Sequence, residues 1–202
     1  MATPSGTARQ TWTALRALLV LTVVLGILYP AAIGLVGLAM PAQANGSLLR
    51  APDGTVVGSS LIGQSFTTKK GQALPSWFQS RPSAAGDGYD GGASSGSNLG
   101  PNNPDLVTAI RDRRAAIAKL EGVPESQVPA DAVTASASGL DPEISAAYAL
   151  LQVRRVAAAR SLDESAVRSL VTERIEGRAL GFVGEPTVNV LELNLALSRL
   201  GG

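Results

Sequence analysis

The hydrophobic and polar positions divide this 202-residue chain into an apolar N-terminal segment and a longer mixed region. Residues 17–40 contain no charged side chain. A helix of that length spans ~36 Å, which exceeds the ~30 Å hydrocarbon core of a bilayer. The pattern predicts an N-terminus at residues 1–15, a single transmembrane helix at residues 16–40 and a separate domain at residues 41–202.

The charges around the apolar segment predict its orientation. Arg9 and Arg16 precede it, and the first acidic residue of the chain is Asp53. Because positive residues stay inside, we expect a cytoplasmic N-terminus and an extracytoplasmic C-terminal domain, in a single-pass protein of the plasma (cell) membrane. The alternative is a signal peptide cleaved after Ala44, where residues 42–44 resemble a cleavage site. The apolar run is longer than the roughly 15-residue core of a signal peptide, which favours a retained anchor.

Small residues follow one face of the predicted transmembrane helix. Gly26, Pro30, Gly34 and Gly37 are spaced 4, 4 and 3 residues apart. Such a face allows another helix to approach closely, so these four residues are candidates for packing on a membrane partner. Pro30 also predicts a kink, because it lacks a backbone N–H. The alternative is that Gly and Pro are simply common in transmembrane helices.

The mixed region opens with patterns typical of short strands. Residues 47–50 and 55–58 are apolar runs on either side of the turn sequence Ala51-Pro52-Asp53-Gly54. This arrangement predicts a hairpin. Residues 61–66 are expected to continue the strands as a meander.

Four helices are expected after the strands. The first begins at Asn103-Pro104 and ends at Gly122, and the second begins with Asp141 as its cap. The third ends at Gly177, and the last covers residues 188–197, with a strand at residues 187–193 as the alternative. The predicted fold class is therefore α+β: one transmembrane helix, then a small exported domain with short strands followed by about four helices.

A long loop rich in Gly, Ser and Asn separates the strands from the helices. It covers residues 84–104 and lacks the Gly-Lys-Ser/Thr sequence of a phosphate-binding loop. Its composition is that of a flexible linker, but loops of this length in compact domains are often functional. The functional alternative is a rim that docks on a partner or lines an ion route. The candidate residues for that role are Asp87, Tyr89, Asp90, Ser97 and Asn98.

Composition restricts the chemistry. The chain has no Cys and no His, so disulfides, Cys or His zinc sites and His-based catalytic triads are excluded. A net charge of +1 does not favour nucleic-acid binding. We predict no catalytic residue and no metal site. Two alternatives remain open: an anchored exported hydrolase that pairs Lys69 or Lys70 with a serine such as Ser59, Ser60 or Ser65, and a free-standing envelope binding protein.

Several motifs, in order along nearly the whole chain after residue 15, carry a family resemblance. They include Leu28-Tyr29-Pro30, Phe78-Gln79-Ser80-Arg81-Pro82, Gly96-Ser97-Asn98-Leu99-Gly100-Pro101, Ser138-Gly139-Leu140-Asp141-Pro142, Gln152-Val153 with Arg155-Val156-Ala157, and Gly184-Glu185-Pro186. Together they resemble the C chain of the Kdp potassium-transporting P-type ATPases, the KdpC family.

The resemblance implies a non-catalytic accessory subunit of a high-affinity potassium import complex. Its expected partners are the potassium-translocating subunit KdpA, the ATPase subunit KdpB and the small peptide KdpF. The implied role is to assist assembly and stabilisation, and to act as a catalytic chaperone that raises the ATP affinity of the ATPase subunit. The resemblance implies no cofactor of the chain's own. It implies ATP only when the chain is in complex with the ATPase subunit.

The resemblance also assigns nucleotide contact to Gln152, the glutamine of the Gln-x-x-Arg-Val-Ala motif. The residues themselves leave another interpretation open. Gln152 lies on a largely apolar helix that the charge pattern places outside the cytoplasm, where a structural amide is equally expected.

Overall fold

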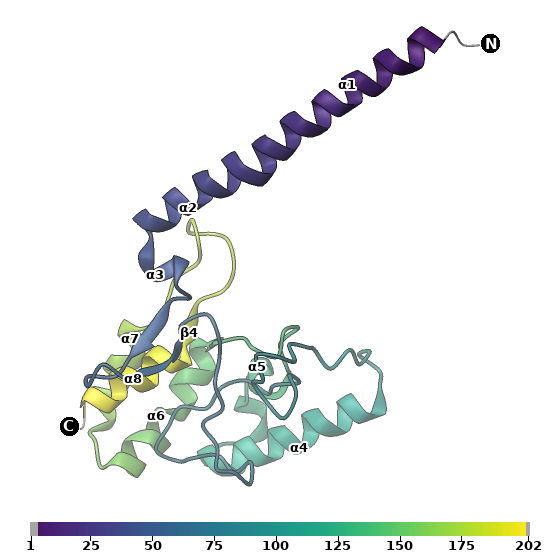
Figure 1. Cartoon of the computed structure of the whole chain (residues 1–202). Coiled ribbons are helices and arrows are strands. Elements are labelled where there is room, and N and C mark those ends of the chain that lie inside the picture. The colour runs from purple at the N-terminus through teal and green to yellow at the C-terminus, as the bar shows by residue number, and fades with distance from the viewer. Residues whose placement is uncertain (1–3, 201–202) are drawn as a thin grey trace. The chain divides into compact units, whose positions relative to one another are not determined.

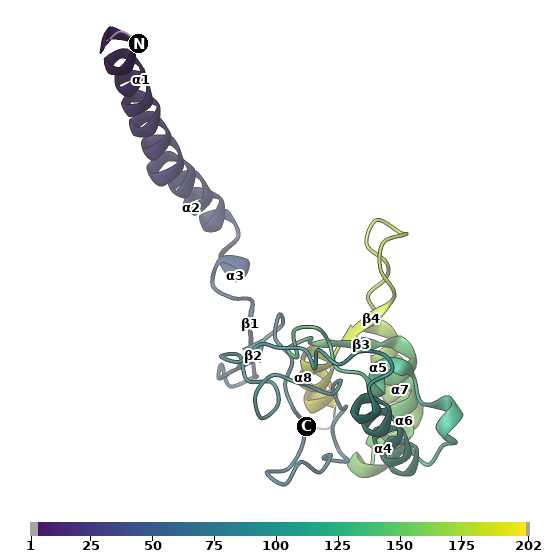
Figure 2. The ribbon, with the colours of Figure 1, turned by 90° about the vertical axis from the view of Figure 1, so that its right-hand side faces the viewer.

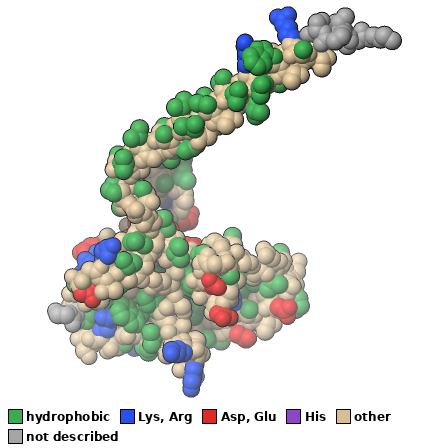
Figure 3. Space-filling model, in the orientation of Figure 1, with side chains coloured by type: hydrophobic (Ala, Val, Ile, Leu, Met, Phe, Trp, Pro, Cys, Tyr) green, Lys and Arg blue, Asp and Glu red, His purple; other side chains and the backbone are tan. Residues whose placement is uncertain are grey.

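The computed structural model describes residues 4–200, which form two compact units divided between Ser47 and Leu48. The first unit is helical: α1 (Pro4–Val23), the π-helical turn η1 (Val24–Leu28), α2 (Tyr29–Ala39) and the short α3 (Pro41–Ala44). Within the described residues, one helix is long and apolar enough to cross a membrane, and it runs over Gly6–Ala39. Figure 3 shows hydrophobic side chains along most of its surface.

Near Pro30, where the sequence predicts a kink, the structure shows a change of helix type one turn earlier. In η1 the Tyr29 N–H donates to the Val24 carbonyl, five residues back. Proline cannot donate the hydrogen bond that an α-helix requires, and the widened turn lets the helix continue past it. The helix also begins earlier than residue 16, because α1 includes the more polar residues that precede it.

The predicted hairpin at the start of the second unit is confirmed. Strands β1 (Leu48–Arg50) and β2 (Val56–Ser59) pair antiparallel, with a register irregularity between Leu49 and Arg50. Asp53 shapes the turn by accepting a hydrogen bond from the Thr55 N–H, which lowers the pKa of its carboxyl.

The expected third strand at residues 61–66 is wrong. This segment lies in turns and loops, and its Gly63 N–H donates to the Leu140 carbonyl instead of to a neighbouring strand. A Cβ on Gly63 would lie 2.4 Å from Tyr89 and 2.5 Å from the Asp141 carbonyl. Close packing on other loops therefore decides the path of the segment.

The first predicted helix is confirmed as α4 (Pro104–Glu121). The Asn103 side chain caps it by accepting from the Asp105 N–H, and Gly122 ends it with a left-handed φ of 67°. Two short elements follow, the 3₁₀ turn η2 (Glu125–Gln127) and α5 (Ala130–Val133).

The second predicted helix begins later than expected. Residues Glu143–Ser145 form strand β3, and α6 (Ala146–Arg160) starts after it with Ser145 as the cap. The local signal at Asp141 is real, since its carboxylate accepts from the Glu143 N–H, but it shapes a turn before the strand. Tertiary pairing overrides the capping signal, because β3 pairs antiparallel with β4 (Thr187–Asn189).

The last two helices show the same tertiary influence. Helix α7 (Glu164–Glu173) ends before Gly177, because Glu176 exchanges two backbone hydrogen bonds with Thr187. At the C-terminal end both alternatives are partly right, since β4 leads directly into α8 (Val190–Leu200).

The core of the second unit lies among these helices (Figures 1 and 2). Helix α6 packs on α4 and α7, and α7 packs on α8. The largest fully buried apolar side chains come from several elements and include Phe78, Ile144, Val153, Val167, Val171, Val188, Leu193 and Leu197. Phe78 belongs to none of the helices or strands, so an irregular segment supplies the largest fully buried side chain of the core. Together these features confirm the α+β class.

Candidate functional site

The small-residue face of the apolar helix has open space beside it. Among the described residues, a Cβ added at Gly26 or Gly34 would meet no heavy atom within 4 Å, and one at Gly37 would contact only Ala44, at 3.5 Å. The large apolar side chains along the same helix are exposed, such as Leu25, at 61%, and Leu35, at 69%. Such a surface is suited to contact with lipid and with other transmembrane helices.

The Gly-rich loop at residues 84–104 is anchored to a second loop near residue 139. The Ser83 hydroxyl donates to the Gly139 carbonyl at 2.6 Å, and the Ser95 N–H donates to the Ser138 carbonyl at 2.9 Å. A Cβ on Gly139 would lie 2.6 Å from the Ser95 carbonyl oxygen. The first half of the loop is therefore packed on the domain, which differs from a flexible linker.

The five candidate residues of this loop do not form one site. Tyr89 points inward, where its hydroxyl donates to the Arg81 carbonyl at 2.9 Å and burial raises its pKa to about 12. Asp90 accepts from the Gly92 N–H within the loop. Asp87, Ser97 and Asn98 are exposed, and no cluster of three acidic residues that could hold a metal occurs among the described residues.

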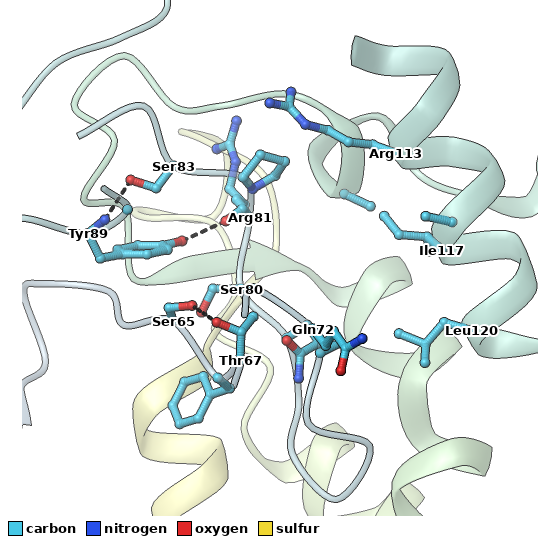
Figure 4. Close-up of a pocket in the computed structure, with 18 of the residues that line it drawn as sticks. Ser65, Thr67, Gln72, Ser80, Arg81, Ser83, Tyr89, Arg113, Ile117 and Leu120 are labelled. Atoms are coloured by element: carbon cyan, nitrogen blue, oxygen red, sulfur yellow. Dashed lines mark hydrogen bonds between the residues drawn. The ribbon is translucent and has the colours of Figure 1, made fainter. Parts of the chain in front are cut away.

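A pocket of about 530 Å³ lies between the segment of residues 65–89 and helix α4 (Figure 4). Its apolar wall includes Ile117 and Leu120 of α4, and its polar wall includes Arg81 and Arg113. Two guanidinium groups beside an apolar wall suit an acidic side chain or a small anion with an apolar part. The sequence did not indicate this pocket, because Arg81 and Arg113 are distant in the chain.

The two arginines of the pocket are held by different partners. Arg81 forms an ion pair with Asp141, at 2.7 Å between Nη1 and Oδ2. Its buried Nε has no hydrogen-bond partner among residues 4–200. Arg113 donates from Nη1 to the Val133 carbonyl at 3.1 Å. Tyr148, which is only 3% exposed, also lines the pocket, and burial raises the pKa of its hydroxyl.

Gln152 lies deeper in the domain, against the segment that passes the pocket. Its side chain is 0% exposed. Its Oε1 accepts from the Gln79 N–H at 2.6 Å, and its Nε2 donates to the Gln79 carbonyl at 3.1 Å. Arg155 also donates to Oε1, at 2.8 Å. The carboxamide thus bonds both backbone groups of residue 79, as a neighbouring strand would in a sheet. Contact between Gln152 and a nucleotide would require this core to open.

Arg155 ties the same segment to helix α4. Its Nε donates to both carboxylate oxygens of Glu121, at 2.9 and 3.1 Å, and its Nη1 donates to the carbonyls of Pro75 and Trp77. Burial raises the pKa of Glu121, and the Arg155 charge opposes that shift. We call Gln152, Arg155 and Glu121 the clamp, because together they hold residues 75–79 on α4 and α6.

Of the residues considered for a hydrolase, Ser65 lines the pocket, whereas the two lysines do not. Lys69 and Lys70 are exposed, and neither lines the pocket. The Ser65 hydroxyl shares a 2.8 Å hydrogen bond with Thr67. The lining of the pocket therefore offers no lysine to pair with Ser65.

Comparisons with known proteins place this arrangement in context. The family model for the KdpC c chain of K⁺-transporting ATPases matches residues 11–199. A potassium-transporting ATPase KdpC subunit of Kineococcus radiotolerans is 56% identical over 94% of this chain and 93% of its own length. Subunits of the same name from Mycobacterium bovis and Streptomyces avermitilis are 52% and 48% identical, over 95% and 97% of this chain and 99% and 96% of theirs.

Proposed function

The chain belongs to the KdpC family of potassium-transporting ATPase subunits, and on that premise we propose that it is a non-catalytic accessory subunit that assists assembly and stabilisation of the complex. The single observation that carries the proposal is the exposed apolar helix over Gly6–Ala39. A helix with so much exposed apolar surface needs a membrane, and its open glycine positions allow close approach of another helix.

The proposed arrangement has a cytoplasmic N-terminus and an extracytoplasmic domain. The helix would pack on transmembrane partners through the face of Gly26, Pro30, Gly34 and Gly37. Those partners would be the potassium-translocating subunit KdpA, the ATPase subunit KdpB and the peptide KdpF. The outer domain would rest on the potassium subunit, with the exposed loop residues Asp87, Ser97 and Asn98 available for that contact.

We further propose that the chain raises the ATP affinity of the ATPase subunit through contact between subunits. The burial of Gln152 and its bonds to Gln79 support an indirect effect, since no atom of that side chain reaches the surface. An indirect effect also agrees with an extracytoplasmic domain, because the nucleotide would then lie on the other side of the membrane.

A pull-down of the tagged full chain in mild detergent tests the proposal, with potassium-stimulated ATPase activity measured on the same eluate. Recovery of a polytopic potassium subunit and a P-type ATPase, with activity lost when the chain is removed, is the expected result. Gly34→Leu should lower that recovery because it fills the open face, whereas Ala32→Leu, about half a turn away, should not. Recovery of the chain alone, with the partners expressed, would contradict the proposal.

A further inference from the structure

A narrow hairpin projects from the second unit between α7 and β4 (Figures 1 and 2). Its base is closed by two hydrogen bonds between the backbones of Glu176 and Thr187, at 2.8 and 3.1 Å. An ion pair of 2.9 Å joins Arg178 to Glu185 across its stem. Beyond that pair lies the tip, which we define as residues 179–183.

The tip exposes large apolar side chains. Leu180 is 86% exposed, Phe182 73% and Val183 50%. No charged residue lies between Arg178 and Glu185. Exposed apolar residues that occur singly need no explanation, but three of them gathered on one projecting tip indicate an interaction surface.

Four of the five N–H groups of the tip are bonded within the hairpin. The N–H groups of Ala179, Gly181, Phe182 and Val183 all donate to carbonyls within the hairpin, at 2.9 to 3.3 Å. Donors that enter an apolar phase must be satisfied internally in this way. Leu180 adopts a φ of 54°, which is uncommon for a leucine and holds its side chain outward at the turn. A bulky residue with a strained backbone and a largely exposed side chain points to a function rather than to packing.

The hairpin lies on the same side of the second unit as the first residue of that unit, Leu48. In both ribbon views it projects from the same side as the Leu48 end of β1. Helix α2 ends at Ala39 and β1 begins at Leu48, so the connection can span at most about 30 Å. If the apolar helix crosses a bilayer, Leu48 therefore lies within about 30 Å of the end of that helix, and a hairpin on the same side of the domain can reach the membrane surface.

We propose that the tip inserts into the outer interface of the bilayer and acts as a second membrane contact for the exported domain. The apolar side chains would enter the acyl boundary, while the Arg178–Glu185 pair stays at the level of the headgroups. Lipid is the occupant that these observations favour, because the short tether places a bilayer within reach whatever the partners are. The inference rests only on the membrane anchoring within the proposed function.

Site-directed labelling tests the inference cleanly, because the chain contains no cysteine of its own. Phe182→Cys is labelled with an environment-sensitive fluorophore, in the full chain reconstituted into phosphatidylcholine–phosphatidylglycerol vesicles and recovered by flotation. Leu180→Cys provides a second reporter in the tip, and Lys70→Cys provides a matched reporter on an exposed turn outside the hairpin. Quenching by nitroxide-labelled lipid and by aqueous iodide is measured for the chain alone and for the assembled complex.

The expected result for the chain alone is a blue shift at both tip positions, with quenching by the lipid and protection from iodide, while the label at residue 70 stays open to iodide. A tip label that iodide quenches and lipid does not would overturn the inference. Protection that appears only in the complex, without lipid quenching, would also overturn it and assign the tip to a partner protein. Loss of partner binding with lipid quenching retained would defeat the accessory-subunit proposal alone.

Discussion

Replacing Gln152 with alanine removes the only side chain that bonds both backbone groups of Gln79 in the described structure. The Gln79 N–H and carbonyl would remain buried beside Phe78, whose side chain is 0% exposed. The substitution therefore separates a structural amide from a nucleotide ligand, because only the structural role predicts a large loss of folding stability.

The size of the loss follows from the contacts. Each buried backbone group left without a partner costs about 1–3 kcal/mol, and the truncated side chain adds a cavity term. Together these effects lower the free energy of unfolding by about 3–6 kcal/mol. Domains of this size are stable by only about 5–15 kcal/mol, so the variant should be close to unfolding at growth temperature.

Urea unfolding of the full chain in detergent measures this loss, with Trp77 fluorescence as the probe because that residue lies in the clamped segment. A slope typical of small domains converts the loss into a midpoint lowered by about 2 M. The urea midpoint of Gln152→Glu should lie between those of the parent and Gln152→Ala. The glutamate keeps the acceptor for the Gln79 N–H but loses the donor to the Gln79 carbonyl. Gln127→Ala, at an exposed glutamine, should stay within about 0.5 kcal/mol of the parent.

The apparent ATP affinity of the assembled complex completes the test. It is measured for each variant at a temperature where the domain remains folded. The reasoning from the clamp is refuted if Gln152→Ala unfolds at the parent midpoint and still lowers ATP affinity. That result would show that Gln152 affects ATP affinity by a route other than the stability of the domain.

Three further changes test other contacts in the domain. Glu121→Ala should cost about 3–5 kcal/mol in the same urea assay, because it leaves the Arg155 charge buried without its carboxylate; an unchanged midpoint would show that the pair contributes nothing. Gly63→Ala should lower the melting temperature by several degrees, because its Cβ would overlap Tyr89. Gly91→Ala is the control, since open space surrounds that position. Equal melting temperatures for the two variants would contradict the packing argument. The pKa of Tyr89 is raised from 10 to about 12. The contribution of its hydroxyl to the free energy of unfolding is therefore complete below pH 10 and is lost as the pH rises through 12. Tyr89→Phe should flatten that alkaline decline, by about 1–2 kcal/mol after a discount for solvent screening, and an identical pH profile would count against the burial of the hydroxyl.

Signals that depend on neighbouring residues were sufficient for several elements. The N-cap at Asn103 and the left-handed Gly122 define α4 from both ends, because these capping bonds join residues only two and four positions apart. The turn around Asp53 defines the first hairpin for the same reason. At Asp141 a distant segment competes with the local signal, because residues 143–145 pair with β4. The Asp141 carboxylate therefore shapes a turn, and the helix begins after the cap at Ser145.

The same distinction separates the candidate sites. The apolar helix, its small-residue face and the absence of Cys and His chemistry are properties of the sequence by itself, because they depend on composition and on a single helical period. The pocket, the clamp and the exposed tip were decided by tertiary structure. Gln79 and Gln152 lie 73 residues apart, and Arg81 and Asp141 lie 60 apart. No spacing along the chain reports such pairs, since only the packing of α4, α6 and the irregular segment before them brings their atoms within hydrogen-bond distance.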